Sequence, residues 1–141
     1  MGALSVAPAT SSSISAAPAN QPIQPGGNPA LFETLFTVST SMTNTGSVPG
    51  AAVAQLYLAL PQPSSASADA TPKKVLRGFG KEMLQPGQSC QVEFALTRRD
   101  VSYWDVGAQQ WMIAEGDVQV MAGWSSRDIQ ATTSFNPLGS E

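Results

Sequence analysis

The residues of this chain that could do chemistry are concentrated in one stretch, LTRRDVSYWDVGAQQW, which runs from Leu96 to Trp111. It holds two arginines, two aspartates, a tyrosine and two tryptophans, although only 12% of the whole chain is charged and 7% is aromatic. Carboxylates beside aromatic rings are typical of sites that process sugars. Asp100 and Asp105 are therefore candidates for a glycosidase pair, which needs two carboxyl groups of different pKa about 5 Å or up to about 9.5 Å apart.

The same two aspartates have a structural interpretation, which we favour. Two acids five residues apart meet the required separation in many loops, so their spacing carries little information. We expect Asp100 to turn the chain after the strand Cys90–Thr97, and both acids to face Arg98 and Arg99 in surface ion pairs. The chain contains no histidine, which removes the commonest general base and the usual zinc ligand. The sequence therefore predicts no catalytic residue, no metal site and no cofactor.

Composition narrows the remaining classes of function. A length of 141 residues fits one domain, and a net charge of −3 without a basic stripe argues against nucleic acid as a partner. The apolar runs are far shorter than the roughly 20 residues that cross a bilayer, so no membrane partner is expected. The N-terminus does not have the pattern of a signal peptide, which leaves a cytosolic chain or a piece of a longer secreted protein. Cys90 is the single cysteine, and we expect its thiol to be buried and inert.

Two segments have the composition of linkers or loops. Residues 1–30 are rich in Ser, Ala, Pro and Gly and lack charge and periodicity, so they are expected to form an extended linker. Residues 31–137 are expected to form the folded domain, and residues 138–141 a short tail. Gln62–Ala70 lies in a second low-complexity stretch and is expected to be a loop whose role stays open.

From residue 31 onward the pattern predicts β-structure. Apolar and polar residues alternate in short runs separated by turn signals, and no run has the period of a helix of ten or more residues. Gly78 and Gly80 indicate a bulge or a close backbone approach, and Pro86-Gly87 indicates a tight turn. The seven expected strands are Phe36–Thr43, Ala54–Leu60, Lys74–Leu84, Cys90–Thr97, Trp111–Ile113, Val118–Ala122 and Ile129–Phe135. This count and spacing predict an all-β, two-sheet antiparallel sandwich of the immunoglobulin-like or fibronectin type III-like kind.

The arginines and aromatic residues each allow two interpretations. Arg77, Arg98, Arg99 and Arg127 could form an anion clamp or anchor an interface, or they could make weak surface ion pairs. Tyr103, Trp104, Trp111 and Trp124 could form a flat platform that stacks on sugars, although aromatic residues in a small sandwich more often pack its core or rim. Trp124 precedes a turn and is the best candidate for an exposed ring.

Several stretches together resemble a known module. PGGNPALFE, NTGSVPGAAVAQLYL, PKKVLRGFGKEMLQPGQS, LTRRDVSYWDVGAQQW and GWSSRDI occur in order between residues 25 and 129. They resemble the C-terminal fibronectin type III-like domain of glycoside hydrolase family 3 enzymes, above all fungal β-glucosidases. The resemblance implies that the catalytic aspartate and glutamate lie in preceding domains absent here, and that Tyr103–Asp105 is not the nucleophile motif. It also implies secretion as part of the parent enzyme, whose substrate, a glucoside, xyloside or other glycoside, stays open.

Three hypotheses about function follow. The first is a non-catalytic accessory domain that packs on the catalytic domains of the parent glycosidase and stabilises them. Its expected docking residues are Arg98, Arg99, Asp100, Tyr103, Trp104 and Asp105, with Arg98, Arg99 and Asp100 facing outward and Trp104 and Trp111 supporting them from beneath. The second is a module that binds an insoluble polymer such as cellulose or lignin through exposed Tyr57, Tyr103 and Trp124. The third, a free-standing enzyme that uses Asp100 and Asp105, has the least support.

Overall fold

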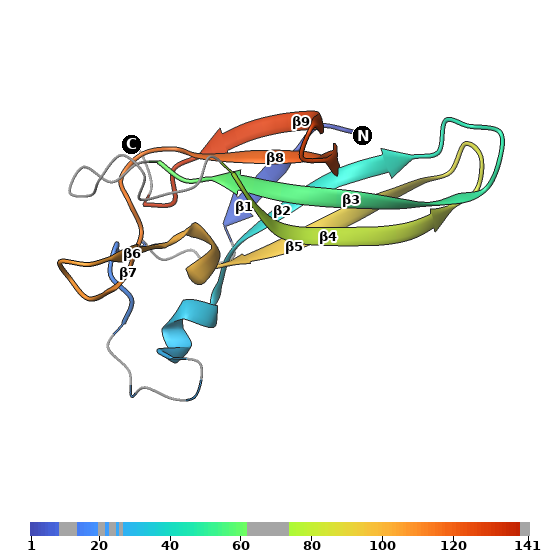
Figure 1. Ribbon diagram of the computed structural model, residues 1–141. Helices are drawn as coiled ribbons and strands as arrows, with labels where there is room; N and C mark the ends of the chain where they lie inside the picture. Colours follow the sequence, from blue (N-terminus) through green and yellow to red (C-terminus); the bar gives the residue numbers. More distant parts are fainter. Residues whose placement is uncertain (9–13, 20–21, 23–24, 26, 62–73, 139–141) are drawn as a thin grey trace.

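The fold is a sandwich of two antiparallel β-sheets with a small hairpin at one end (Figure 1). The computed structural model describes residues 1–8, 14–19, 22, 25, 27–61 and 74–138. One sheet has the strand order β1-β2-β5, the other has the order β4-β3-β8-β9, and β6 pairs with β7 alone. The strands are β1 (Ser5–Pro8), β2 (Thr34–Thr43), β3 (Gly50–Ala59), β4 (Val75–Leu84), β5 (Ser89–Thr97), β6 (Tyr103–Asp105), β7 (Gln110–Met112), β8 (Val118–Ser125) and β9 (Asp128–Phe135). Two short 3₁₀ helices, η1 (Pro29–Phe32) and η2 (Arg99–Val101), complete the described elements.

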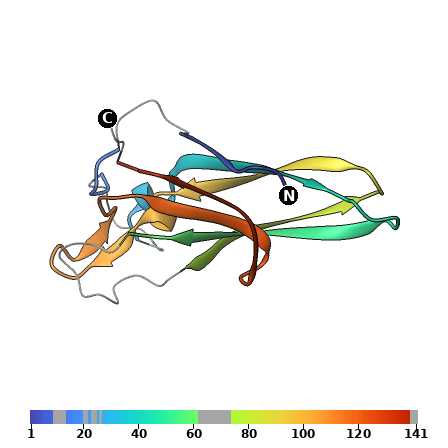
Figure 2. The ribbon, with the colours of Figure 1, turned by 90° about the horizontal axis from the view of Figure 1, so that it is seen from above.

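This architecture confirms the predicted all-β sandwich. All seven expected strands are present as β2, β3, β4, β5, β7, β8 and β9, with boundaries shifted by a few residues. Seen from above, β2 and β5 form one layer and β3 and β4 the other (Figure 2). The predicted loop Gln62–Ala70 lies outside the described residues. Within the described part of the chain, no helix is long and apolar enough to cross a membrane.

The N-terminal segment contributes more to the sandwich than its composition indicated. Residues 1–30 were expected to be a linker, but Ser5–Pro8 forms β1 and pairs antiparallel with β2. Ahead of it, the Gly2 amide donates to the Ser41 carbonyl at 2.8 Å. The four residues of β1 are too few and too weakly alternating to give a strand signal, so their pairing depends on the free edge that β2 offers.

The core lies between the two sheets and is built from the inward-facing side chains of each long strand. Strand β5 illustrates the pattern, because Val92, Phe94 and Leu96 are buried while the residues between them are exposed or half-buried. Their partners across the sandwich include Leu56 and Leu58 of β3, which are almost completely buried. Cys90 follows the same inward phase and is half-buried against this core.

Strand β4 packs closely on β5 because it carries glycine at two inward positions. A Cβ atom at Gly78 would lie 2.9 Å from Cδ1 of Phe94, and one at Gly80 would lie 2.7 Å from Cγ1 of Val92. The ladder between β3 and β4 shifts at the same place, because Leu56 pairs with Gly78 but the next residue pairs with Leu76. Arg77 is therefore the extra residue of a bulge. Both interpretations of the two glycines, a bulge and a close approach, are confirmed.

The two ends of the sandwich differ in character (Figure 1). The hairpin end carries η1, η2 and the β6–β7 hairpin. The turn end carries the β2–β3 loop and the β4–β5 turn, where the Gln88 amide donates to the Gln85 carbonyl at 2.9 Å. Gly87 has a φ of 77° in this turn, as the Pro86-Gly87 pair predicted.

Candidate interdomain surface

Asp100 holds the sharp turn that leaves β5 at the hairpin end. Its Oδ2 accepts hydrogen bonds from the amide of Thr97 at 2.9 Å and from the hydroxyl of Thr97 at 3.1 Å. In return the Asp100 amide donates to Oγ1 of Thr97 at 3.3 Å. The expectation that Asp100 turns the chain after this strand is confirmed. Its hydrogen bonds go to Thr97, and its charge acts on the neighbouring Arg99.

Arg98 does not face outward, which corrects the expected arrangement of the docking residues. Only 7% of its surface is exposed, and its Nη1 donates to the Ser15 carbonyl at 2.8 Å. A second bond holds the N-terminal segment nearby, because the Ile113 amide donates to the Ala16 carbonyl at 2.9 Å. Burial lowers the pKa of Arg98, and the negative charge of Glu33 acts in the opposite direction. Arg98 therefore anchors a part of the predicted linker to the domain.

Arg99 of η2 and the two tryptophans of the β6–β7 hairpin pack against one another. The Arg99 guanidinium lies 3.6 Å from the centroid of the Trp111 ring, within the range of a cation–π interaction. Trp104 meets Trp111 edge-on, with ring centroids 5.7 Å apart and an interplanar angle of 73°. Trp111 is half-buried, but Trp104 is 46% exposed. The expectation that both rings lie beneath the arginines is therefore wrong for Trp104, because β6 carries its ring on the outer side of the pair.

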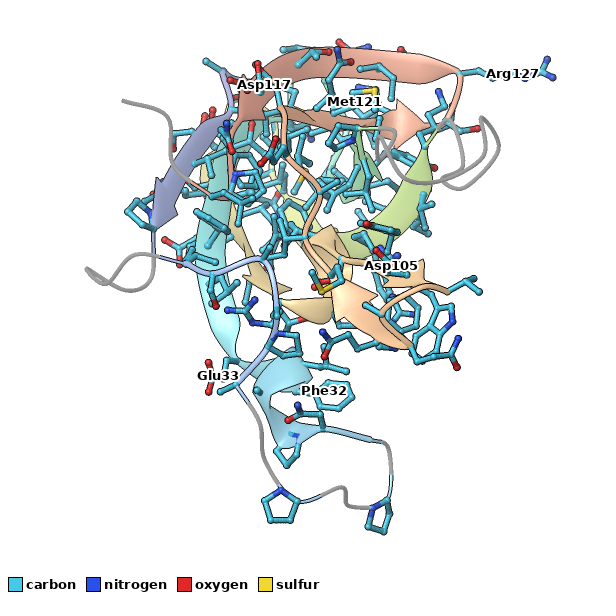
Figure 3. The ribbon with its side chains drawn as sticks, turned by 90° about the vertical axis from the view of Figure 1, so that its left-hand side faces the viewer. Phe32, Glu33, Asp105, Asp117, Met121 and Arg127 are labelled. Atoms are coloured by element: carbon cyan, nitrogen blue, oxygen red, sulfur yellow. The ribbon has the colours of Figure 1, made fainter. Side chains whose placement is uncertain are left out.

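Asp105 and Tyr103 fix the hairpin from within. The Tyr103 hydroxyl donates to Oδ2 of Asp105 at 2.9 Å, and the Ala108 amide donates to Oδ1 at 3.1 Å. The Ala108 amide is the main reason that the pKa of Asp105 is lowered, followed by the Tyr103 hydroxyl. Tyr103 itself is buried. Figure 3 looks onto this end of the molecule, with Asp105 on the hairpin and Phe32 and Glu33 at η1 below it.

These hydrogen bonds give the carboxylates of Asp100 and Asp105 structural roles in local turns. A glycosidase needs one carboxyl group whose pKa is raised, so that it can donate a proton to the leaving group. The pKa of Asp105 is shifted in the opposite direction. The described residues also include no group of three or more Cys, Asp or Glu side chains that could hold a metal ion.

The three residues expected to bind polymer do not form one surface. Tyr57 is buried, and its hydroxyl donates to Oε1 of Gln55. Tyr103 is buried in the hairpin, and Trp124 is half-buried against the core. Trp124 also lines an open groove of about 490 Å³ at the turn end, together with residues of the β2–β3 loop. Asn44 in this groove is engaged in the loop itself, because its side chain bonds to Val48, Leu84 and Gly46.

An exposed apolar surface, which was not expected from the sequence, lies on the outer side of β4. It consists of Leu76, Phe79 and Met83, and Phe79 is 72% exposed. Gly78 and Gly80 occupy the inward positions of this strand, so Phe79 and Met83 must project outward. The alternation in KVLRGFGKEML predicted a strand, but it did not show that the apolar side chains on one face of this strand are exposed. We refer to Leu76, Phe79 and Met83 as the outer β4 face.

The fibronectin type III-like domain family matches residues 52–126, which is more than half of the chain. The chain belongs to this family. The match begins in β3 and ends just after β8, so it includes the bulge in β4 and the whole β6–β7 hairpin.

Sequence relatives of this fibronectin type III-like domain are much longer proteins. The domain is 51% identical over 126 residues to probable β-glucosidase G of Emericella nidulans. The aligned region covers 89% of this chain and 15% of that protein. It is 54% identical over 121 residues to probable β-glucosidase L of Aspergillus fumigatus, covering 86% of this chain and 16% of that protein. The chain thus spans about 15% of the length of the curated relatives it matches.

Solved structures that resemble the domain also belong to much longer chains. The fibronectin type III-like domain superposes on part of the β-D-glucoside glucohydrolase of Trichoderma reesei with a TM-score of 0.82 and 43% identity, covering 94% of this chain and 18% of that one. A glycoside hydrolase family 3 β-glucosidase of Neurospora crassa matches with a TM-score of 0.71 and 44% identity, over 79% of this chain and 12% of that one. The domain is therefore similar to a small part of such enzymes.

Proposed function

We propose that the fibronectin type III-like domain is a non-catalytic accessory domain of a secreted fungal glycoside hydrolase family 3 β-glucosidase, and that it stabilises the catalytic domains by packing on them. The observation that carries this proposal is the chain's match to about 15% of the length of β-glucosidases. The catalytic domains of the parent enzyme would then be its partners, in the degradation of cellulose or another β-glucan.

The hairpin end supports a docking role within this proposal. Trp104 presents a half-exposed ring on a rigid base, because Trp111 supports it from one side and Arg99 covers the face of Trp111. Tyr103 and Asp105 hold the hairpin in one shape. Aromatic and arginine side chains on a preorganised scaffold are the usual anchors of an interface, because little side-chain entropy is lost when they bind.

Removal of the domain from the full-length parent enzyme tests the proposal. We expect the truncated enzyme to melt at a lower temperature and to express less well, because the covered surface of the catalytic domains becomes exposed to water. Trp104→Ala in the full-length enzyme should also lower the Tm. Val48→Ala is the matched control, because Val48 is also apolar and exposed but lies at the turn end. An unchanged Tm and yield after deletion of the whole domain would contradict the proposal.

Attachment to an insoluble polymer is the alternative function. The burial of Tyr57 and Tyr103 weakens it, since a stacking platform needs exposed rings. A pull-down of the isolated chain with microcrystalline cellulose and with lignin tests it. Depletion above that of an inert protein of equal size and charge would favour this alternative.

We also infer that the isolated chain has no glycosidase activity. Asp100 and Asp105 both hold local turns, and the lowered pKa of Asp105 opposes a role as acid catalyst. Release of nitrophenol from an aryl glucoside by the purified chain, lost in Asp100→Ala or Asp105→Ala, would overturn this inference.

A further inference from the structure

Residues 14–19 run along the hairpin end of the domain, and we refer to them as the strap (Figure 1). Nη1 of Arg98 donates a hydrogen bond to the Ser15 carbonyl at 2.8 Å. The Ile113 amide donates to the carbonyl of the next strap residue, Ala16, at 2.9 Å. The strap is therefore held through its backbone, by two donors that lie far away in the sequence.

Arg98 reaches the strap from a backbone that is fixed on both sides. Its amide donates to the Glu33 carbonyl at 3.0 Å, and its carbonyl accepts from the hydroxyl of Ser102 at 2.6 Å. Its side chain is buried, yet its Nε has no hydrogen-bond partner in the described part of the chain. A buried charge whose donors are incompletely used is a costly way to stabilise a fold. Stability alone is therefore a poor explanation of this arginine, and the placement of the strap is a better one.

The two bonds to the strap lie on either side of the contact between Arg99 and Trp111. Arg98 directly precedes Arg99, whose guanidinium lies 3.6 Å from the centroid of the Trp111 ring. Ile113 follows Trp111 by two residues and lies directly after β7. One short segment of backbone therefore ties the start of η2 to the end of β7, around the pair that supports Trp104. Release of the strap would leave η2 and β7 freer to shift relative to each other.

We propose that Arg98 is a positioning residue for docking. By holding the strap it keeps Arg99 and Trp111 together, and it thereby fixes the exposed ring of Trp104 in the orientation that meets the catalytic domains of the parent enzyme. This proposal rests on the proposed accessory function and names the residue that prepares its contact surface. A preorganised anchor loses less conformational freedom on binding, so a released strap should weaken docking without unfolding the sandwich.

Arg98→Met tests the strap in the isolated chain, because it removes the donor to Ser15 and leaves an apolar stem in the buried site. We expect the Ile113 amide to exchange with deuterium about tenfold faster, since the strap opens more often when one of its two bonds is lost. Amides of the ladder between β2 and β5 should keep their exchange rates. The coupled far-ultraviolet circular dichroism of Trp104 and Trp111, whose ring centroids are 5.7 Å apart, should weaken as their geometry loosens.

Two further variants separate the strap from other effects of the substitution. Arg98→Lys should restore part of the protection of the Ile113 amide, because an ammonium group can still donate to the strap. Ser15→Ala is the matched control, since it removes the hydrogen bond from the Ser15 hydroxyl to Ala17 but keeps the carbonyl that Arg98 binds. It should leave the exchange of Ile113 unchanged. If Arg98→Met does not fold, a chain that begins at residue 20 replaces it, because this deletion removes the strap and the edge strand β1 but no other strand.

In the full-length parent enzyme, Arg98→Met should lower the Tm, and its effect should be less than additive with that of Trp104→Ala because both act through the same ring. Additive losses would overturn the positioning role and leave the accessory function standing. Unchanged exchange of Ile113 and an unchanged tryptophan signal in the isolated chain would also overturn it. If deletion of the whole domain leaves the Tm of the enzyme unchanged, the accessory function itself fails, and the proposed role of Arg98 in docking fails with it.

Discussion

At the residue scale, Asp105 shows how one carboxylate can stabilise a hairpin. It accepts hydrogen bonds from an amide within its own turn and from a hydroxyl on the same strand, and both donors favour the charged form. The pKa in the folded chain is therefore below the ordinary value of 3.8, which the unfolded chain retains. Because the folded value is the lower one, the stabilisation is complete well above 3.8 and is lost as the pH falls through the folded pKa.

The corresponding prediction concerns Asp105→Asn, which removes the charge but keeps a carbonyl oxygen. We expect the variant to melt at a lower temperature than the unsubstituted chain at pH 7, and the difference to shrink as the pH falls below about 4. Thermal melting followed by near-ultraviolet circular dichroism between about pH 3 and pH 7 measures it. Asp117→Asn, in the exposed turn before β8, is the control and should give a difference that is smaller at pH 7. A pH-independent difference for Asp105→Asn would contradict the assignment.

At the element scale, the approach of β4 to β5 depends on the absence of side chains at two positions. We predict that Gly80→Ala lowers the free energy of unfolding by about 1–3 kcal/mol, because the new methyl group would overlap Cγ1 of Val92. Val92 is β-branched and buried in the core, so its side chain has little freedom to rotate away. Urea denaturation of the two proteins measures the change.

Gly50→Ala is the matched control for this element, because Gly50 also lies in a strand but has no atom within 4 Å of the position that an alanine methyl group would take. It should be neutral or stabilising by about 0.4–1 kcal/mol, since alanine restricts the unfolded chain more than glycine does. Equal urea midpoints for Gly80→Ala and Gly50→Ala would mean that β4 can move away from β5 without loss of stability. This result would contradict the packing described for β4.

At the scale of the whole molecule, the outer β4 face should govern solubility. The chain has a net charge of −3 at pH 7 and a pI of about 4.7, so electrostatic repulsion between molecules disappears near that pH. We predict a solubility minimum there, and a higher solubility at that pH for Phe79→Thr combined with Met83→Thr, which shorten two exposed apolar side chains on one strand. Val48→Thr, a single exposed residue on a loop, should change little. Light scattering against pH measures the effect, and an equal gain from Val48→Thr would contradict it.

The sequence alone determined the seven longer or clearly alternating strand segments and the position of several turns. The alternation through Cys90, Val92, Phe94 and Leu96 is a local property of the chain, and any sheet must bury that face. The turn at Gly87 and the bulge at Gly78 are local as well, because glycine permits backbone shapes and close approaches that other residues do not. The short strands β1 and β6 left no such signal, since three or four residues cannot establish a period.

Only the tertiary structure decided which charged and aromatic side chains are exposed. Arg98 was expected in water, yet it is buried because its partner is a carbonyl 83 residues earlier in the chain. Trp104 and Tyr103 are neighbours of similar polarity, but the pleat of β6 places one ring outside and the other inside. Burial depends on contacts between segments that are distant in the sequence, and for that reason local patterns could not assign the candidate site.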